Sequence, residues 1–333
     1  MKHYNIKIKD IAVYYPYNVV GNEHFIEHFE AINVDVNGLM THLGREQRYL
    51  ADEEETSLTM AFEACSKVLR YSNVSAESID MIILSSETPE YTSPSNALKL
   101  NNMLGAKNAH IVYDINNNCI GMLTALDLAS TYAKIKKNIK NILVVGTLLI
   151  SSVVNKNDPV TYSNFGDSAA AVLLEAIEED KESGFIDSNF FTDSSYHDSI
   201  VMPACGYSKI YDDKISEESK RWSWNPFDFS FLAEKWSELI LELVSKNDLK
   251  AADIDHFVFS QFSKPDAIKT LEILNVDSEN FSYVGDEFGY TGTTSPIFGL
   301  RNAIRLGKVK EGAKVILCSV GAGYTMSCLL YKF

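Results

Sequence analysis

The chain contains the stretch Val74-Ser-Ala-Glu-Ser-Ile-Asp-Met-Ile-Ile-Leu84, in which a polar turn and an Ile-Asp pair lead into an apolar run. The same pattern returns 175 residues later in Leu249-Lys-Ala-Ala-Asp-Ile-Asp-His-Phe-Val-Phe259. Each copy follows a segment with apolar residues at helical spacing, residues 57–71 in the first copy and 231–245 in the second. An amphipathic segment followed by a short aliphatic run predicts a helix and a buried strand. The repeat therefore predicts two related halves.

A second unit is repeated at nearly the same spacing. In each half an apolar run is followed by a loop, a helix and a further strand. The segments are 110–113, 121–136 and 141–146 in the first half and 281–284, 295–306 and 314–318 in the second. Strands that alternate with helices of ten or more residues are typical of α/β proteins with largely parallel strands. We expect an α/β fold of two pseudo-twofold halves, residues 1–177 and 178–333.

Composition and charge exclude several classes of protein. The 333 residues are 46% hydrophobic and 23% charged, which is typical of a globular chain with a sizeable core. The formal net charge of −15 disfavours binding to nucleic acid or to an anionic lipid surface. The longest apolar stretch, residues 142–154, is shorter than the ~20 residues of a membrane helix. Since the start of the chain has no export signal, we expect a cytoplasmic protein without a nucleic-acid or membrane partner.

The five cysteines contain no C-x-x-C pair, which predicts free thiols and argues against a disulfide framework or a zinc site. The stretch His24-Phe-Ile-Glu-His28 matches a short zinc-protease pattern, but no downstream ligands accompany it. We interpret it as an amphipathic helix. The sequence therefore predicts neither a metal nor a cofactor.

Cys119 differs from the other four cysteines because a polar loop leads into it and the helix predicted at 121–136 begins just after it. Free N–H groups and the helix dipole at such a position favour the thiolate over the thiol. We expect Cys119 to be a nucleophile.

A segment dense in aromatic residues interrupts the second half at residues 205–236. Its first aromatic residues are Tyr207, Tyr211, Trp222, Trp224, Phe227, Phe229 and Phe231. Such a segment indicates either a lid over an apolar substrate tunnel or a loop packed on its own small core. The sequence leaves both interpretations open.

Several segments, taken together, resemble one family over nearly the whole chain. They are Gly44-Arg-Glu-Gln-Arg48, Thr92-Ser-Pro-Ser95, Met103-Leu-Gly105, the Cys119 loop, Leu143-Val-Val-Gly146, Phe165-Gly-Asp-Ser-Ala-Ala170 and Val320-Gly-Ala-Gly-Tyr-Thr325. The family is the β-ketoacyl-acyl-carrier-protein synthase III branch of the thiolase-like condensing enzymes. The resemblance implies a five-layered αβαβα fold and a dimer. It also implies a Cys, His, Asn triad that takes an acyl group from a thioester and condenses it with a decarboxylating malonyl unit.

The resemblance implies that Cys119 is the nucleophile, but this chain has other residues at the remaining two positions of the triad. Ser260 stands where the family has its histidine, and Tyr290 stands where it has its asparagine. By family position, the backbone N–H groups of Cys119 and Ala322 form the oxyanion hole. Neither a serine nor a tyrosine carries a positive charge or is a good base near neutral pH. We therefore expect malonyl condensation to be impaired and acyl transfer to survive.

A replacement base has three candidates. His197 lies in a stretch that borders the pocket in this family, and Asp286 and Glu287 shortly precede Tyr290. The alternative for each is an ordinary solvated surface residue.

The acyl donor is expected to be an acyl-carrier protein or an acyl-coenzyme A thioester. The family's residues for coenzyme A correspond here to Gly38 and His42, which favours the carrier protein. Because carrier proteins are acidic, docking needs a basic face, and Lys264, Arg301 and Arg305 are the candidates. The alternative is a solvated helix face.

Taken together, the sequence predicts an acyltransferase in fatty-acid-like or specialised metabolism. It would form an acyl-enzyme on Cys119 and pass the acyl group to an acceptor. Two alternatives stay open: a carbon–carbon bond-forming ketosynthase with a non-standard triad, and a catalytically weakened partner subunit of a homologous condensing enzyme. The chain is accordingly expected in a homodimer or in a heterodimer with a homologous subunit.

Overall fold

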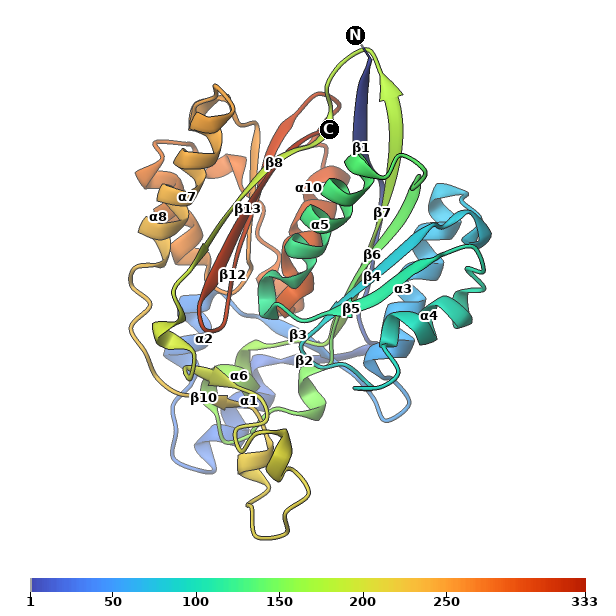
Figure 1. Cartoon of the computed structure of the whole chain (residues 1–333). Coiled ribbons are helices and arrows are strands. Elements are labelled where there is room, and N and C mark those ends of the chain that lie inside the picture. Colours follow the sequence, from blue (N-terminus) through green and yellow to red (C-terminus); the bar gives the residue numbers. More distant parts are fainter. Residues whose placement is uncertain (1) are drawn as a thin grey trace.

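Two β-sheets stand side by side in the computed structural model, which describes residues 2–333 (Figure 1). The first sheet has the order β1 (His3–Tyr14), β7 (Ser168–Glu179), β6 (Asn141–Leu148), β4 (Met81–Ser86) and β5 (Ile111–Ile115). The second has the order β11 (His256–Phe259), β12 (Lys314–Gly321), β13 (Thr325–Lys332) and β8 (Gly184–Thr192). Two short pairs, β2 (Asn18–Gly21) with β3 (Gln47–Leu50) and β9 (Ile200–Val201) with β10 (Ser223–Trp224), lie outside the sheets.

Helices fill the space between the sheets and cover both outer faces (Figure 1). The inner pair is α5 (Gly121–Ile135) and α10 (Ser295–Arg305), and the outer helices are α3 (Ser57–Ser72) and α4 (Asn96–Leu104) on the first sheet and α7 (Leu232–Lys246) and α8 (Lys264–Ile273) on the second. Three apolar cores fill the four interfaces between these layers: a central core surrounds the inner helices and contacts both sheets, and one core lies between each sheet and its outer helices. Burial of apolar surface in each space holds the layers together. The five-layered αβαβα arrangement is confirmed.

The internal repeat is confirmed as well. α3 and β4 of the first half correspond to α7 and β11 of the second, and α5 and β6 correspond to α10 and β12. The chain leaves the first sheet at the end of β7 and enters the second at the start of β8, between residues 179 and 184. This crossing lies close to the boundary predicted between residues 177 and 178.

The expectation of largely parallel strands was wrong. Only the β4–β5, β4–β6 and β11–β12 pairs are parallel, and the other four pairings within the two sheets are antiparallel. β13, for example, returns along β12 through a short hairpin without a crossover helix, and such a connection produces antiparallel neighbours.

The strand expected at residues 281–284 does not form. Only an isolated bridge joins Phe281 to Phe257. Two hydrogen bonds that involve side chains hold this segment in another course. The Val284 N–H donates to Gln261 Oε1 at 2.8 Å, and the Tyr283 hydroxyl donates to the Leu43 carbonyl at 2.6 Å. Side-chain contacts of this kind have no signature in a local apolar pattern.

Short helices below the sheets complete the chain. They are α1 (Asn22–Glu30), α2 (Asn37–Leu43), α6 (Pro159–Asn164) and α9 (Gly285–Phe288). The predicted amphipathic helix is α1, whose Phe25 and Phe29 are buried. In the part of the chain that the structure describes, no three His, Cys, Asp or Glu side chains gather where they could hold a metal ion. None of the helices from residue 2 onward combines the length and apolar character needed to cross a bilayer.

Candidate active site

Cys119 lies in a 3₁₀ turn, Asn118–Ile120, that leads directly into α5, as the sequence predicts. Groups from the second half hold this turn in place. The Asn118 amide donates to the Ala322 carbonyl at 3.1 Å, and the Met122 N–H at the start of α5 donates to Thr293 Oγ1 at 2.8 Å. The position of the thiol is therefore determined by both halves of the chain.

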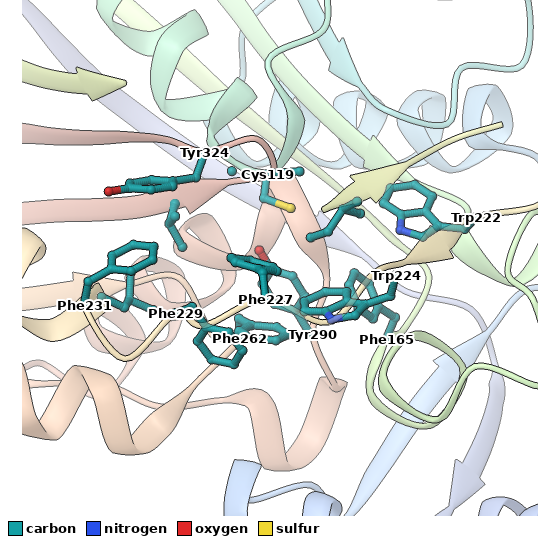
Figure 2. Close-up of a pocket in the computed structure, with 15 residues that line it drawn as sticks. Cys119, Phe165, Trp222, Trp224, Phe227, Phe229, Phe231, Phe262, Tyr290 and Tyr324 are labelled. Carbon is teal, nitrogen blue, oxygen red and sulfur yellow. The ribbon is translucent and has the colours of Figure 1, made fainter. Parts of the chain in front are cut away.

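The thiol faces a cavity with almost entirely apolar walls (Figure 2). The cavity has an empty volume of about 610 Å³, including its opening to solvent. Its lining residues are Cys119, Phe165, Ile200, Trp222, Trp224, Phe227, Phe229, Phe231, Leu232, Phe262, Tyr290, Val320, Gly321, Ala322 and Tyr324. Trp224 stacks on Phe262 with ring centroids 5.6 Å apart, and Phe231 stacks on Tyr324 at 4.4 Å.

The aromatic-rich segment divides into two parts. Its second part, from Trp222 to Leu232, supplies six of the fifteen lining residues, so it covers the Cys119 cavity as a lid would. Its first part projects away from the body of the protein as a loop (Figure 1). Tyr211 in that loop is 94% exposed, and neither it nor Tyr207 lines the Cys119 cavity.

Ser260 and Tyr290 come from the second half, and Tyr290 lines the cavity together with Cys119. Ser260 lies behind it, where its Oγ donates to the Tyr290 hydroxyl at 3.2 Å. The phenol ring packs edge-on against Phe165 and Phe262, with centroid distances of 4.9 and 5.2 Å. The structure thus brings together the three residues at the family's triad positions.

Arg45 supports the segment that carries Ser260. Its guanidinium is buried and donates to the carbonyls of Gln261 at 3.0 Å and Phe262 at 2.7 Å. Among the ion pairs of the described residues none involves Arg45, so backbone carbonyls and Tyr283 take the place of a carboxylate partner. This arginine of the first half therefore fixes the backbone of the second half beside the site.

The sequence analysis missed Glu87, which contacts the nucleophile directly. The Cys119 thiol donates to Glu87 Oε1 at 3.5 Å, with Oε2 at 3.9 Å. Glu87 follows β4, and Cys119 follows the neighbouring parallel strand β5. Because the carboxyl ends of adjacent parallel strands meet at one edge of a sheet, an acidic residue directly after an apolar strand was the signal that could have identified it.

The electrostatics of the site favour a thiol over a thiolate. Burial, the Glu87 carboxylate beside it and their hydrogen bond raise the pKa of Cys119, and the neighbouring Tyr290 hydroxyl opposes them only in part. Loss of hydration raises the pKa of Glu87 to about 7. The prediction that the helix terminus yields a thiolate was therefore wrong, because burial outweighs the helix dipole here.

The three predicted replacement bases do not reach the thiol. His197 is exposed on the surface, where its Nδ1 lies 3.0 Å from Asp198 Oδ1. Asp286 and Glu287 lie on α9, and neither lines the Cys119 cavity. We therefore place none of them at the site.

The predicted basic face is split between two places. Lys264 borders a groove between α2 and α8 together with His42 and Lys269. Arg301 and Arg305 line a different groove, against β1 and the last residue of the chain. The expectation of one docking face that contains all three residues was wrong, because α10 lies between the sheets whereas α8 lies on an outer face (Figure 1).

Replacement of Glu87 by glutamine is expected to make Cys119 more reactive toward iodoacetamide. The E87Q change removes a neighbouring negative charge and so lowers the pKa of the thiol. At a pH below that pKa, a thiol that is about ten times more acidic has about ten times more thiolate. The measurement is the pH profile of Cys119 alkylation, followed by peptide mass. An unchanged or higher midpoint in E87Q would show that the carboxylate does not act on the thiol.

Comparisons with known proteins identify the family of this chain. The model of the family "3-Oxoacyl-[acyl-carrier-protein (ACP)] synthase III" matches residues 113–194, and the model of its C-terminal part matches residues 244–333. The β-ketoacyl-[acyl-carrier-protein] synthase III of Clostridium perfringens strain ATCC 13124 is 32% identical over 330 residues, which cover 98% of this chain and 99% of that protein. The enzyme of the same name from Ehrlichia canis is 30% identical and covers 98% of each chain.

A solved structure supports the same assignment. The crystal structure of 3-oxoacyl-[acyl-carrier-protein] synthase III from Aquifex aeolicus VF5 superposes with a TM-score of 0.85 at 27% identity, over 99% of this chain and 100% of that chain. The layered fold agrees with this likeness. The chain belongs to the 3-oxoacyl-acyl-carrier-protein synthase III family of condensing enzymes and has its thiolase-like fold.

Proposed function

We propose that this protein is an acyltransferase that forms an acyl-enzyme on Cys119 from a thioester and then passes the acyl group to an acceptor. The observation that carries the proposal is the Cys119 thiol facing an apolar, aromatic-walled cavity. Such walls bind an alkyl chain through the hydrophobic effect and hold its carbonyl end near the thiol. Family membership supports the same chemistry.

The backbone around Cys119 suits the proposed acyl transfer. Attack of the thiol on a thioester carbonyl forms a tetrahedral intermediate with a negative oxygen, which backbone N–H groups stabilise. Ala322 lines the cavity beside Cys119, and the Asn118 amide holds its carbonyl. We therefore keep the Cys119 and Ala322 N–H groups as the proposed oxyanion hole.

Ser260 and Tyr290 favour transfer over malonyl condensation. Condensation requires donors directed at the carbonyl of a second thioester, where enolate charge develops. Here the Tyr290 hydroxyl accepts a hydrogen bond from Ser260, and the ring packs between Phe165 and Phe262. The site therefore offers the malonyl unit neither a histidine nor an asparagine.

Incubation of the protein with octanoyl-N-acetylcysteamine is expected to add one octanoyl group to Cys119. Intact mass and peptide mapping measure the adduct. The C119A variant should lose it by at least about a thousandfold, since the covalent step has no other nucleophile at the site. The control is C205A, which removes the half-exposed free cysteine outside the cavity and should leave the adduct intact. An adduct that is absent, or that follows Cys205, would refute the proposal.

A condensing ketosynthase with a non-standard triad is the second candidate. Retention of Cys119 in a family of condensing enzymes favours it. Malonyl- and β-ketoacyl-thioesters supplied with the acyl donor distinguish the two candidates, because only condensation gives a product with a longer carbon skeleton.

We also propose that the chain works as a dimer. β5 is an edge strand of the first sheet, with Ile111, Tyr113 and Ile115 only half buried, and an edge of this kind can pair with another chain. Light scattering on the purified chain tests for a homodimer. Co-purification with a homologous chain that carries a complete triad would instead favour a partner subunit.

The groove between α2 and α8 is the proposed docking site for an acyl-carrier protein. Lys264 begins α8 two residues after Phe262, which lines the cavity, and Lys269 and His42 border the same groove. These side chains give an otherwise acidic protein a local positive surface beside the proposed site.

Charge reversal at this groove, K264E with K269E, is expected to raise the KM for an acyl-carrier-protein donor about tenfold, since two attractive charges become repulsive. The KM for octanoyl-N-acetylcysteamine should not change, because that donor lacks the carrier protein. The matched control is R301E with R305E, which alters the separate groove beside β1. A larger effect of the control pair would move the docking site there.

We further propose that the protein acts in the cytoplasm. All five cysteines are free thiols in the structure, as a reducing compartment would keep them.

A further inference from the structure

We propose that Glu87 is the catalytic base of this enzyme and takes the place of the family's histidine. The inference rests on the proposed acyl transfer at Cys119. In this proposal one carboxylate accepts and returns the proton in both half-reactions of the acyl transfer.

Geometry carries the assignment. Glu87 Oε1 lies 3.5 Å from the Cys119 sulfur and accepts its proton in a hydrogen bond. Gly292, at φ +55°, packs against the same oxygen, and a Cβ there would lie 3.0 Å from Oε1. The lack of a side chain at this position lets the backbone approach the carboxylate closely and confine it beside the thiol.

The hydrogen bond at the sulfur runs from Cys119 to Glu87, so Glu87 is the acceptor of the thiol proton. The Tyr290 hydroxyl, which accepts a hydrogen bond from Ser260, lowers the pKa of Cys119 and so favours the developing thiolate when the proton leaves.

Charge supports the same role. The ionisable groups that act on Glu87 from the thiol side are Cys119, from the turn before α5, and Tyr290, from the loop after α9. Two further carboxylates, Glu90 and Asp114, line the hollow on its other side. Among the ion pairs formed by the described residues none includes Glu87. With a pKa raised to about 7, the carboxylate is a stronger base than an ordinary glutamate and can both take and return a proton near neutral pH.

The first half-reaction balances with one proton. The Cys119 sulfur bonds to the thioester carbonyl carbon while its proton moves to Glu87. The intermediate then collapses, the bond from carbon to the donor sulfur breaks, and the departing thiolate takes the proton from Glu87. The products are the acyl-enzyme, the free donor thiol and an ionised Glu87.

The second half-reaction repeats the cycle with an acceptor that carries a proton on its nucleophilic atom. That atom attacks the acyl carbon and gives its proton to Glu87. The bond from carbon to the Cys119 sulfur breaks, and the leaving sulfur is reprotonated by Glu87. The enzyme returns to its starting state without any other reactant.

Glu87 can also be reached from a second cavity. It lines a polar hollow at the carboxyl ends of β4 and β5, together with Glu90, Asp114 and Asn116. Glu87 does not line the Cys119 cavity itself, but its hydrogen-bond partner Cys119 does. The carboxylate can therefore exchange its proton through the hollow while an acyl chain occupies the Cys119 cavity. This position suits a base that serves an acceptor as well as the thiol.

Acyl exchange provides a test that needs no knowledge of the natural acceptor. Octanoyl-N-acetylcysteamine is mixed with deuterium-labelled N-acetylcysteamine, and transfer of the octanoyl group to the labelled thiol is followed by mass. The E87Q variant is expected to exchange about 10²- to 10⁴-fold more slowly than the wild type, the range for a lost general base. E53Q, which changes an exposed carboxylate that lines neither cavity, should exchange at the wild-type rate.

Two further readouts separate a base from a structural role. Wild-type exchange should rise with pH through about 7, where Glu87 becomes ionised, and E87Q should lack this rise. Exogenous formate should restore exchange in E87A, because it supplies a carboxylate to the vacated space. Faster alkylation of Cys119 in E87Q, alongside slower exchange, would show that the variant keeps a folded site.

The outcomes are distinct. Wild-type exchange with an undiminished rate in E87Q, or an unchanged pH profile, overturns the assignment of Glu87 but leaves the acyl-enzyme intact. Absence of both exchange and a Cys119 adduct in the wild type refutes the proposed function, and the assignment with it.

Discussion

A seam of buried polar groups between the two halves holds the site together. The Met122 N–H reaches Thr293 Oγ1 across it at 2.8 Å, and the hydroxyls of Ser168 and Thr294 lie 2.8 Å apart. Arg45 adds hydrogen bonds to the backbone beside Ser260. Because a buried polar group without a partner is costly, displacement of one half would break several such bonds at once. The seam thereby fixes Cys119 of the first half against Ser260 and Tyr290 of the second.

A second negative charge beside Cys119 and Glu87 would be energetically costly. A charged group loses hydration there, and a second like charge a few ångströms away would be repelled strongly. Helix N-termini contribute roughly 0.3–1 kcal/mol to a nearby anion, which is less than burial removes. The raised pKa of Cys119 favours a thiol beside the Glu87 carboxylate, and the proposed reaction depends on transfer of the proton between them.

The sequence was sufficient for the elements that rest on local patterns. The repeat of an amphipathic helix and a buried strand predicted α3 with β4 and α7 with β11, and the loop before a helix identified Cys119. Long-range contacts were not visible in the same way. The missing strand at residues 281–284 and the role of Arg45 both depend on partners more than 20 residues away. The sequence did not indicate a role for Glu87 for the same reason, because its partner Cys119 is 32 residues away.

The duplicated fold explains how a base could change its place without a change of architecture. β4 and β11 occupy corresponding positions in the two halves, and each ends beside the nucleophile. Ser260, at the family's histidine position, directly follows β11, and Glu87 follows the end of β4. A pseudo-twofold arrangement thus presents two comparable strand ends to one thiol. Loss of the base at one end is compatible with the proposed catalysis when the other end supplies a carboxylate, and the hydrogen bond from Cys119 to Glu87 is what such an exchange requires.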